Sequence, residues 1–415
     1  MTDTPVPGVL APGALAGIRV VDCSRILAGP ICTQTLGDLG ADIVKIERPG
    51  MGDDTRKWGP PFLKDADGND TSESAYYLST NRNKRSVGLD ISRPEGREVL
   101  FRLLETADVF IENFKVGDMA RYGLAYEQIR ERFPRLVYAS ITGFGQTGPY
   151  APRAGYDFLA QGMGGVMSVT GEADGEPMKV GVAIADVMTG MHTAIAILAA
   201  LRHRNSSGRG QYIDAALLDT QVSWLINQGM NYLVGGTAPG RLGNAHPNIT
   251  PYQVFATSDG HVILGVGNDQ QFAKFCRFAG REEIASDPRF ANNVARVRNR
   301  AETVELVAGI MRTRTMAEWV EGLEAVGVPC GPVNTIDQVF ADPQVRARAM
   351  QQQIPDHALT QEPIPTIAYP LKLSDAPASY RLPPPILGQH TDEVLGGELG
   401  LSTDELAKLR ESGAI

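Results

Sequence analysis

The stretch IRVVDCSRILAGPICTQTLGDLGADIVKIER, residues 18–48, decides the fold. It begins with the apolar run IRVVDCS and ends with DIVKIER, and both runs predict strands. Between them, residues 29–41 have helical periodicity, and Pro30 suits a first helical turn. The stretch therefore predicts a strand–helix–strand unit, from which parallel sheets are built.

The same alternation continues through the first half of the chain. Residues 93–107 have an apolar helical face, and residues 108–113 and 135–142 are apolar runs of strand length. The strongest helical pattern covers residues 185–204, and the polar run NSSGRG ends it. Strands that alternate with helices predict an α/β fold with a parallel sheet covered on both faces.

The chain of 415 residues is long enough for more than one domain. The pattern loosens after residue 204, a smaller α+β pattern follows, and residues 361–388 are rich in proline. The domains expected from these changes are a large domain over 1–204 with 386–415, a linker over 205–250, a small α+β domain over 251–345, and a Pro-rich return linker over 346–385.

Composition excludes several classes of protein. The net charge of −9 argues against a general nucleic-acid binder, which needs a basic surface. No uninterrupted apolar window approaches 18 residues, and the N-terminus has no basic region before an apolar one, so neither a membrane span nor a signal peptide is expected. The four cysteines are scattered without metal-ligand spacing. These features predict a cytoplasmic protein without a metal site.

The segment ITGFGQTGP, residues 141–149, contains glycines at the G-x-G-x-x-G spacing of a dinucleotide-binding loop. Such a loop needs a helix that begins at the third glycine, because that helix end holds the pyrophosphate. Here Gly148 is followed by PYAPRAG, in which two prolines oppose a helix. We interpret the glycines as residues of a tight turn, with an NAD-dependent oxidoreductase as the remote alternative.

Two acidic residues, Asp157 and Asp186, stand at the starts of predicted helices. Either could be a helix cap and nothing more. Glycines lie nearby, at Gly164-Gly165 and Gly190, and small residues near a carboxylate would leave room for a ligand. An ionised carboxylate in a partly closed site can act as a nucleophile towards an activated acyl group.

These motifs lie in a chain that resembles the class III CoA-transferases along nearly its whole length. That family includes formyl-CoA and carnitine CoA-transferases and the α-methylacyl-CoA racemases. The resemblance is closest to the succinyl-CoA:glutarate (dicarboxylate) subgroup. It rests on residues 17–56 and on NRNKRSVGLDI, FIENF, ITGFGQTGP, AGYD, ADVMTGMHTAIAILAAL, RGQYIDAALLD and PPPILGQHTDEVL, with WGPPF, PYQVF and GNDQQFAKFC for the subgroup.

The resemblance implies a fold and a reaction. The fold would be a Rossmann-like large domain and a small domain joined by two long linkers, with two chains interlocked as a homodimer. The catalytic nucleophile would be Asp186, with Tyr156 and Asp157 as the neighbouring pair, and the intermediate would be an aspartyl-CoA thioester. Racemases have a histidine before the second acid, where this chain has Tyr156. A phenol with a pKa of about 10 is a poor proton shuttle. Tyr156 therefore favours CoA transfer, and racemisation is the alternative reaction.

The substrates implied are an acyl-CoA, with succinyl-CoA as the expected donor, and small dicarboxylic acids such as glutarate, without a tightly bound cofactor. Arg241 and His246 are the candidates for the far carboxylate of the acid. Lys84 and Arg85 form the densest basic cluster, to be read either as phosphate ligands or as a solvated turn. A CoA-binding protein without catalysis is the non-enzyme alternative, against which Asp157 and Asp186 speak. The CoA contacts implied by the family are Ile26, Leu27, Ala28, Arg48, Leu89, Asn113, Phe114 and Arg121.

Overall fold

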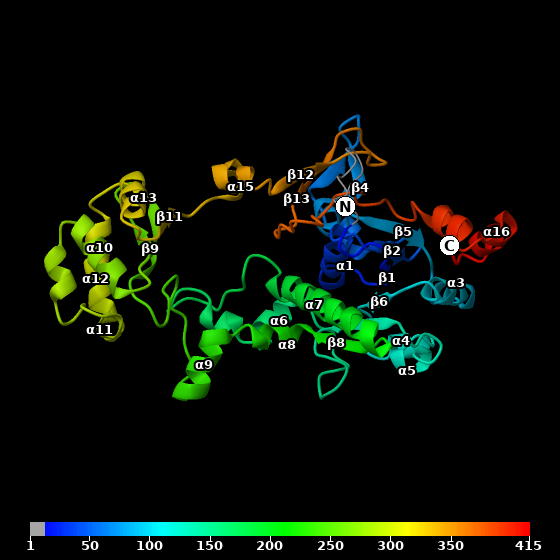
Figure 1. The fold of residues 1–415 in the computed structure, drawn as a ribbon, viewed down its shortest axis with the longest axis horizontal. Helices are drawn as coiled ribbons and strands as arrows, with labels where there is room; N and C mark the ends of the chain where they lie inside the picture. Colours follow the sequence, from blue (N-terminus) through cyan, green and yellow to red (C-terminus); the bar gives the residue numbers. More distant parts are fainter. Residues whose placement is uncertain (1–12) are drawn as a thin grey trace, which may run out of the picture. The chain divides into compact units, whose positions relative to one another are not determined.

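The computed structural model describes residues 13–415, so the first twelve residues of the expected large domain lie outside the described range. The chain divides into two compact units (Figure 1). The small unit comprises Gly165–Val180 and Leu225–Asp342, and the large unit comprises the rest. Residues 205–224, which the sequence pattern suggested for a linker, therefore belong to the large unit.

The large unit is built on a sheet of six parallel strands. The opening stretch forms β1, α1 and β2, as the sequence predicts. The order places the first strand in the middle, and the direction of winding reverses between β1 and β6, which is where ligands collect in doubly wound sheets. In spatial order the strands are β5 (Lys84–Gly88), β2 (Asp42–Glu47), β1 (Arg19–Asp22), β6 (Val109–Glu112), β7 (Val137–Thr142) and β8 (Tyr212–Ala216).

Helices cover both faces of this sheet because successive strand residues point to opposite sides. Val20 packs in the core cluster that includes residues of α1 (Ala28–Asp38) and α7 (Ile184–Ser207). Its neighbour Val21 packs in the cluster that includes residues of α3 (Pro94–Leu104) and α16 (Thr403–Glu411). The other helices of the large unit are short: α2 (Ala75–Thr80), α4 (Asp118–Arg121), α5 (Tyr126–Ile129), α6 (Asp157–Met163), α8 (Leu217–Ser223) and α15 (Pro343–Ala347).

Antiparallel strands make the smaller sheets. In the large unit β3 (Phe62–Lys64) pairs with β4 (Asp70–Ser74), and β12 (Gln351–Ile354) with β13 (Ile364–Ile367). The small unit confirms the predicted α+β pattern, with a sheet in the order β11 (Cys330–Pro332), β10 (His261–Gly265), β9 (Tyr252–Ala256). Its helices are α9 (Ile226–Gly235), α10 (Asp269–Phe278), α11 (Asn293–Arg298), α12 (Arg300–Met311), α13 (Met316–Ala325) and α14 (Ile336–Ala341).

The helices α1 and α7 lie side by side on one face of the sheet, as Figure 1 shows. Gly190 of α7 permits this approach, because a Cβ there would lie 2.4 Å from the carbonyl oxygen of Ala28. The space at Gly190 is therefore filled by α1 and is not left for a ligand, contrary to the sequence-based expectation. By length and composition α7 could cross a membrane, yet it packs here in the core of the large unit.

Candidate active site

Two adjoining pockets lie in the large unit at the carboxyl ends of β1 and β6, the point where the winding reverses. Their volumes are about 380 and 260 Å³, and both are lined by Arg25, Phe114 and Asp118. The first also contains Tyr156 and Asp186. The residues implied as CoA contacts divide between them: Ile26, Leu27, Ala28, Asn113 and Phe114 line the first, and Arg48, Leu89 and Phe114 line the second.

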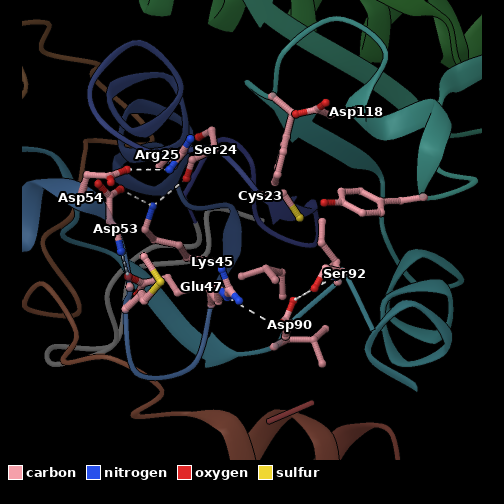
Figure 2. Close-up of a pocket in the computed structure, with 18 residues that line it drawn as sticks. Cys23, Ser24, Arg25, Lys45, Glu47, Asp53, Asp54, Asp90, Ser92 and Asp118 are labelled. Atoms are coloured by element: carbon pink, nitrogen blue, oxygen red, sulfur yellow. Dashed lines mark hydrogen bonds and ion pairs between the residues drawn. The ribbon is translucent and has the colours of Figure 1, made fainter. Parts of the chain in front are cut away.

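The loop after β1 is held in a strained conformation by a buried ion pair. Ile26 has a φ of 74°, a region that β-branched residues rarely adopt. Its backbone N–H donates to the Asp53 carboxylate at 3.1 Å, and Asp53 in turn accepts from Lys45 at 3.0 Å (Figure 2). Lys45 also donates to the carbonyl oxygen of Ser24 at 2.8 Å. The pair thus fixes both ends of the segment that leads into the pocket.

Asn113 joins the loop after β6 to the loop after β1. Its side-chain oxygen accepts from the backbone N–H of Arg25 at 3.0 Å, and its amide donates to the Arg25 carbonyl at 2.7 Å. Glu112, one residue earlier, accepts from the Phe114 backbone N–H at 2.7 Å. Burial raises the pKa of Glu112 to about 7. These bonds hold the two loops as one wall of the site.

Asp157 caps the long helix that carries Asp186. Its Oδ1 accepts from the backbone N–H groups of Ala185 at 2.8 Å and of Asp186 at 3.3 Å, and its Oδ2 accepts from Gln161 at 2.7 Å. These are N–H groups that a helix start leaves unpaired. The cap interpretation therefore applies to Asp157, which binds α7 although it stands in the first turn of α6.

The far end of α7 is anchored as well. Arg204 donates to the Asp108 carboxylate at 2.7 Å and to the backbone carbonyl of Arg135 at 3.2 Å. The side chain of Arg204 is buried, with an exposed fraction of 6%. The helix is therefore fixed at its first turn by Asp157 and at its last turn by the edge of the sheet.

Asp186 has no such capping role. Among residues 13–415 no group donates a hydrogen bond to its carboxylate, and it lines the pocket that contains the expected CoA contacts. Burial, together with the nearby charge of Asp157, raises the pKa of Asp186 to about 7. A carboxylate without hydrogen-bond donors is more nucleophilic than a solvated one, and a raised pKa reports the same lack of stabilisation of its charge.

The glycine-rich segment forms a turn that positions Tyr156, which confirms the turn interpretation. Gly145 and Gly148 have φ values of 84° and 87°, which glycine adopts without strain. A Cβ on Gly143 would lie 2.4 Å from the Cα of Gly155, so two backbone segments touch there. No helix begins at Gly148, and α6 starts only at Asp157, so the geometry of a dinucleotide-binding loop is absent from this segment.

Neither of the expected basic-cluster roles fits Lys84 and Arg85, because both lie in β5 and not in a solvated turn. Lys84 is fully buried and donates to the carbonyl of Pro30 at 2.9 Å, and burial lowers its pKa to about 7. Arg85 is paired with Asp42, Glu393 and Glu398, and its side chain is 11% exposed. Partners inside the protein thus occupy both side chains, and neither lines the two pockets.

The remaining predicted residues lie in different places. Arg48 lines the second pocket, is exposed and pairs with Asp90 at 3.4 Å. Arg121 is exposed and paired with Asp118. Arg241 and His246 belong to the small unit, where Arg241 donates to two backbone carbonyls, those of Glu172 and Gly175.

The pocket residues that the sequence interpretation missed include Arg25, Asp53 and Arg153. Arg25 directly precedes three of the expected CoA contacts, so its position in the loop after the first strand was an available signal. Arg153 lies three residues before Tyr156 in a segment interpreted only as a turn. No sequence pattern near Asp53 indicated its role, because Ile26 is 27 residues away in the chain and Lys45 lies in a strand that is buried in the fold.

Comparison with known proteins identifies the family. The model of CoA-transferase family III matches residues 15–391. The chain belongs to CoA-transferase family III. A succinate–glutarate CoA-transferase from Agrobacterium fabrum is 51% identical over 92% of this chain and 94% of its own length. The human succinyl-CoA:glutarate CoA-transferase is 41% identical over 97% of this chain and 90% of its own length.

Structural comparison agrees with the sequence comparison. A CAIB/BAIF family protein from Brucella suis has a TM-score of 0.81 and 48% identity, over 93% of this chain and 99% of the other. The α/β fold and the family predicted from the sequence are thereby confirmed. This CoA-transferase is an enzyme whose substrates are CoA thioesters. In residues 13–415 no cluster of three or more metal-ligating side chains occurs, and the four cysteines are free.

Proposed function

We propose that this CoA-transferase moves CoA from succinyl-CoA to glutarate or a similar dicarboxylic acid, with Asp186 as the nucleophile. The observation that carries the proposal is the placement of Asp186 in a pocket that several of the expected CoA contacts also line, without hydrogen-bond donors and with a raised pKa. The relatives from Agrobacterium fabrum and human, named for these two acids, support the substrates.

In the first half-reaction an Asp186 oxygen attacks the thioester carbonyl of succinyl-CoA. The C–S bond breaks, and a mixed succinyl–aspartyl anhydride and CoA thiolate form. The thiolate then attacks the aspartyl carbonyl, succinate leaves, and Asp186 is converted to a CoA thioester. In the second half, glutarate attacks that thioester, and the released thiolate attacks the glutaryl carbonyl. Glutaryl-CoA leaves, and the Asp186 carboxylate is restored.

The chain's own residues would support these steps. Each tetrahedral centre carries an oxyanion, which preorganised N–H groups stabilise. Leu27 and Ala28, at the start of α1, line the pocket that contains Asp186, and the first N–H groups of a helix have no partner within the helix. Asp157 would act as a positioning residue, because it fixes the first turn of α7 and its charge disfavours a second charge on Asp186. Tyr156, which is 62% exposed, would contact the substrate.

The proposal includes a homodimer of interlocked chains in the cytoplasm. It is supported by α9, which exposes large apolar side chains that a second copy would cover: Ile226 (69%), Met230 (54%), Leu233 (73%) and Val234 (81%). Light scattering after size-exclusion chromatography tests the stoichiometry. A monomeric mass at micromolar concentration contradicts the dimer.

The test of the reaction is incubation with succinyl-CoA and an equimolar panel of acids, followed by mass spectrometry of all acyl-CoA products. We expect glutaryl-CoA, and none with Asp186→Asn. Asn preserves the volume of the side chain but is not a carboxylate nucleophile. Hydroxylamine trapping of the Asp186 thioester, after incubation with succinyl-CoA and no acceptor acid, tests the intermediate. Deuterium exchange at an acyl α-carbon, without new thioesters, would instead support the racemase alternative.

A further inference from the structure

The pocket that contains Asp186 is also lined by three cations, Arg25, Lys115 and Arg153, which are engaged to different extents. Arg25 pairs with Asp54 at 2.8 Å and also lines the second pocket. Arg153 is exposed, and within the described residues no carboxylate pairs with it. One guanidinium in the pocket of the nucleophile is therefore available to an anionic ligand.

Ring contacts hold the guanidinium of Arg153 in place. It lies over the Tyr150 ring at 4.6 Å from the centroid and near the Phe144 ring at 5.5 Å. Such contacts orient the group through its flat face, which leaves the N–H donors at its edge for another partner. The loop is itself ordered, because the Arg153 N–H donates to the Tyr150 carbonyl at 2.9 Å and Gly155 packs against Gly143.

Charge in the pocket makes such a cation necessary for a dicarboxylic substrate. Asp186 lines the pocket, and Asp157 binds the backbone beside it. A dicarboxylic acyl group brings a second carboxylate, which would be repelled by these acids and costly to desolvate without a partner. Arginine matches a carboxylate with two parallel hydrogen bonds.

We propose that Arg153 binds the far carboxylate of the dicarboxylic acid while Asp186 reacts at the near one. This inference rests on the proposed function and names the residue that selects the substrate class. Apolar side chains of the same pocket, Ile141 and Leu217, would contact the methylene groups between the two carboxylates. Arg25 and Arg48, at the second pocket, would then serve the phosphates of CoA.

The assignment differs from the one drawn from the sequence, in which Arg241 or His246 bound this carboxylate. The guanidinium of Arg241 already donates to the carbonyls of Glu172 and Gly175, at 3.2 and 2.6 Å. His246 accepts from the Asn248 backbone N–H at 3.1 Å. Arg153 lines the same pocket as Asp186, which makes it the better candidate to bind the far carboxylate.

The test compares glutarate with valerate, a five-carbon acid that lacks the second carboxylate. Initial rates with saturating succinyl-CoA give kcat/KM for each acceptor in the full-length wild type, R153Q, R153K and K115Q. The matched control is R202Q, an exposed arginine far along α7 from Asp186. Melting temperatures verify that each variant is folded.

We expect R153Q to lower kcat/KM for glutarate by about 10- to 100-fold, the range for a lost hydrogen bond to a charged group, and for valerate by less than about 3-fold. R153K should retain part of the preference for glutarate. Equal losses for both acids in R153Q, or a loss of the preference in K115Q instead, would overturn the assignment to Arg153.

Failure of the proposed function has a different signature. A wild type that forms no new thioester from any acid refutes the function, and the inference falls with it. An active wild type whose glutarate preference is unchanged in R153Q refutes only the inference. Product formation by the wild type therefore tests the function, and the ratio of the two kcat/KM values in R153Q tests the inference.

Discussion

Replacing Asp53 with asparagine removes the charge that faces Lys45 but preserves the volume of the side chain. Both side chains are fully buried, with 3.0 Å between Asp53 Oδ2 and Lys45 Nζ. Removing one partner of a buried pair costs about 3–5 kcal/mol, because the other charge remains buried. Asp22 and Glu47 also raise the pKa of Lys45, so part of its stabilisation survives. We therefore expect D53N to lose about 3 kcal/mol of unfolding free energy, at the lower end of that range.

Urea unfolding at pH 7.5 of the wild type, D53N, K45M and the double variant measures this loss and the coupling between the two residues. The matched control is Asp54→Asn, the neighbouring carboxylate, whose pair with Arg25 is about half exposed on each side. Exposed pairs contribute about 0–1 kcal/mol, so D54N should remain within that range of the wild type.

The same variant tests whether the Asp53–Lys45 pair holds the loop after β1 in the conformation that lines the pocket. Without the Asp53 charge, the strained backbone at Ile26 is held less firmly, so the KM for succinyl-CoA should rise in D53N. Two results would refute the reasoning. One is a loss below about 1 kcal/mol in D53N. The other is a loss in the double variant that equals or exceeds the sum of the losses in D53N and K45M, since that would show no favourable coupling.

Three further outcomes follow from the site. D186N should be inactive. At pH 8 it should be more stable than the wild type by up to about 4 kcal/mol, because the wild type must keep the Asp186 charge buried. The stability that the neutral Asp186 carboxyl contributes is fully present below about pH 4 and is lost as the pH rises through its folded-state pKa of about 7. D157N should move the acid limb of kcat/KM below pH 7, though only in part, because burial is the larger cause of the shift. G190A should cost about 1–3 kcal/mol, because its Cβ meets Ala28 and α1 must shift.

Each of these outcomes has a direct check. Thermal unfolding from pH 5 to pH 8 compares D186N with the wild type, and parallel curves contradict the raised pKa. An unmoved acid limb in D157N removes Asp157 as a cause. For G190A the matched variant is G309A in α12, where a Cβ meets no atom within 4 Å, and helix propensity favours alanine. A cost in G309A equal to that in G190A would argue against a clash with α1.

The sequence predicted the parts of the fold that depend on local pattern. The strand–helix–strand stretch and the long helix of Asp186 have clear periodicity, and both formed as predicted. The order of the strands in the sheet could not be predicted from local sequence pattern, because burial between distant segments decides which strands pair. Lys84 shows the limit of local polarity: the run NRNKRS resembles a turn, yet it includes the start of the buried strand β5.

The sequence indicated some of the residues that line the two pockets, but not how they assemble. The expected contacts on the loops after β1 and β6 share the two pockets, because parallel strands end at the same edge. The interaction of Asp53 with Ile26 depends on a positive φ in a β-branched residue, which no propensity predicts. Arg153 was hidden for a related reason: its neighbours Gly143 and Gly155 meet only when the loop folds back on β7.

The double anchoring of α7 makes its length a constraint. Asp186 and Arg204 are eighteen residues apart, which is five turns of an α-helix and about 27 Å. The two side chains are therefore in phase along the helix. Inserting a single residue between them would rotate the nucleophile by about 100° relative to the buried Arg204–Asp108 pair. Inserting four would nearly restore the angle but displace Asp186 by about 6 Å. Among homologous chains, the spacing between these two positions should thus tolerate insertions far less than the loops do.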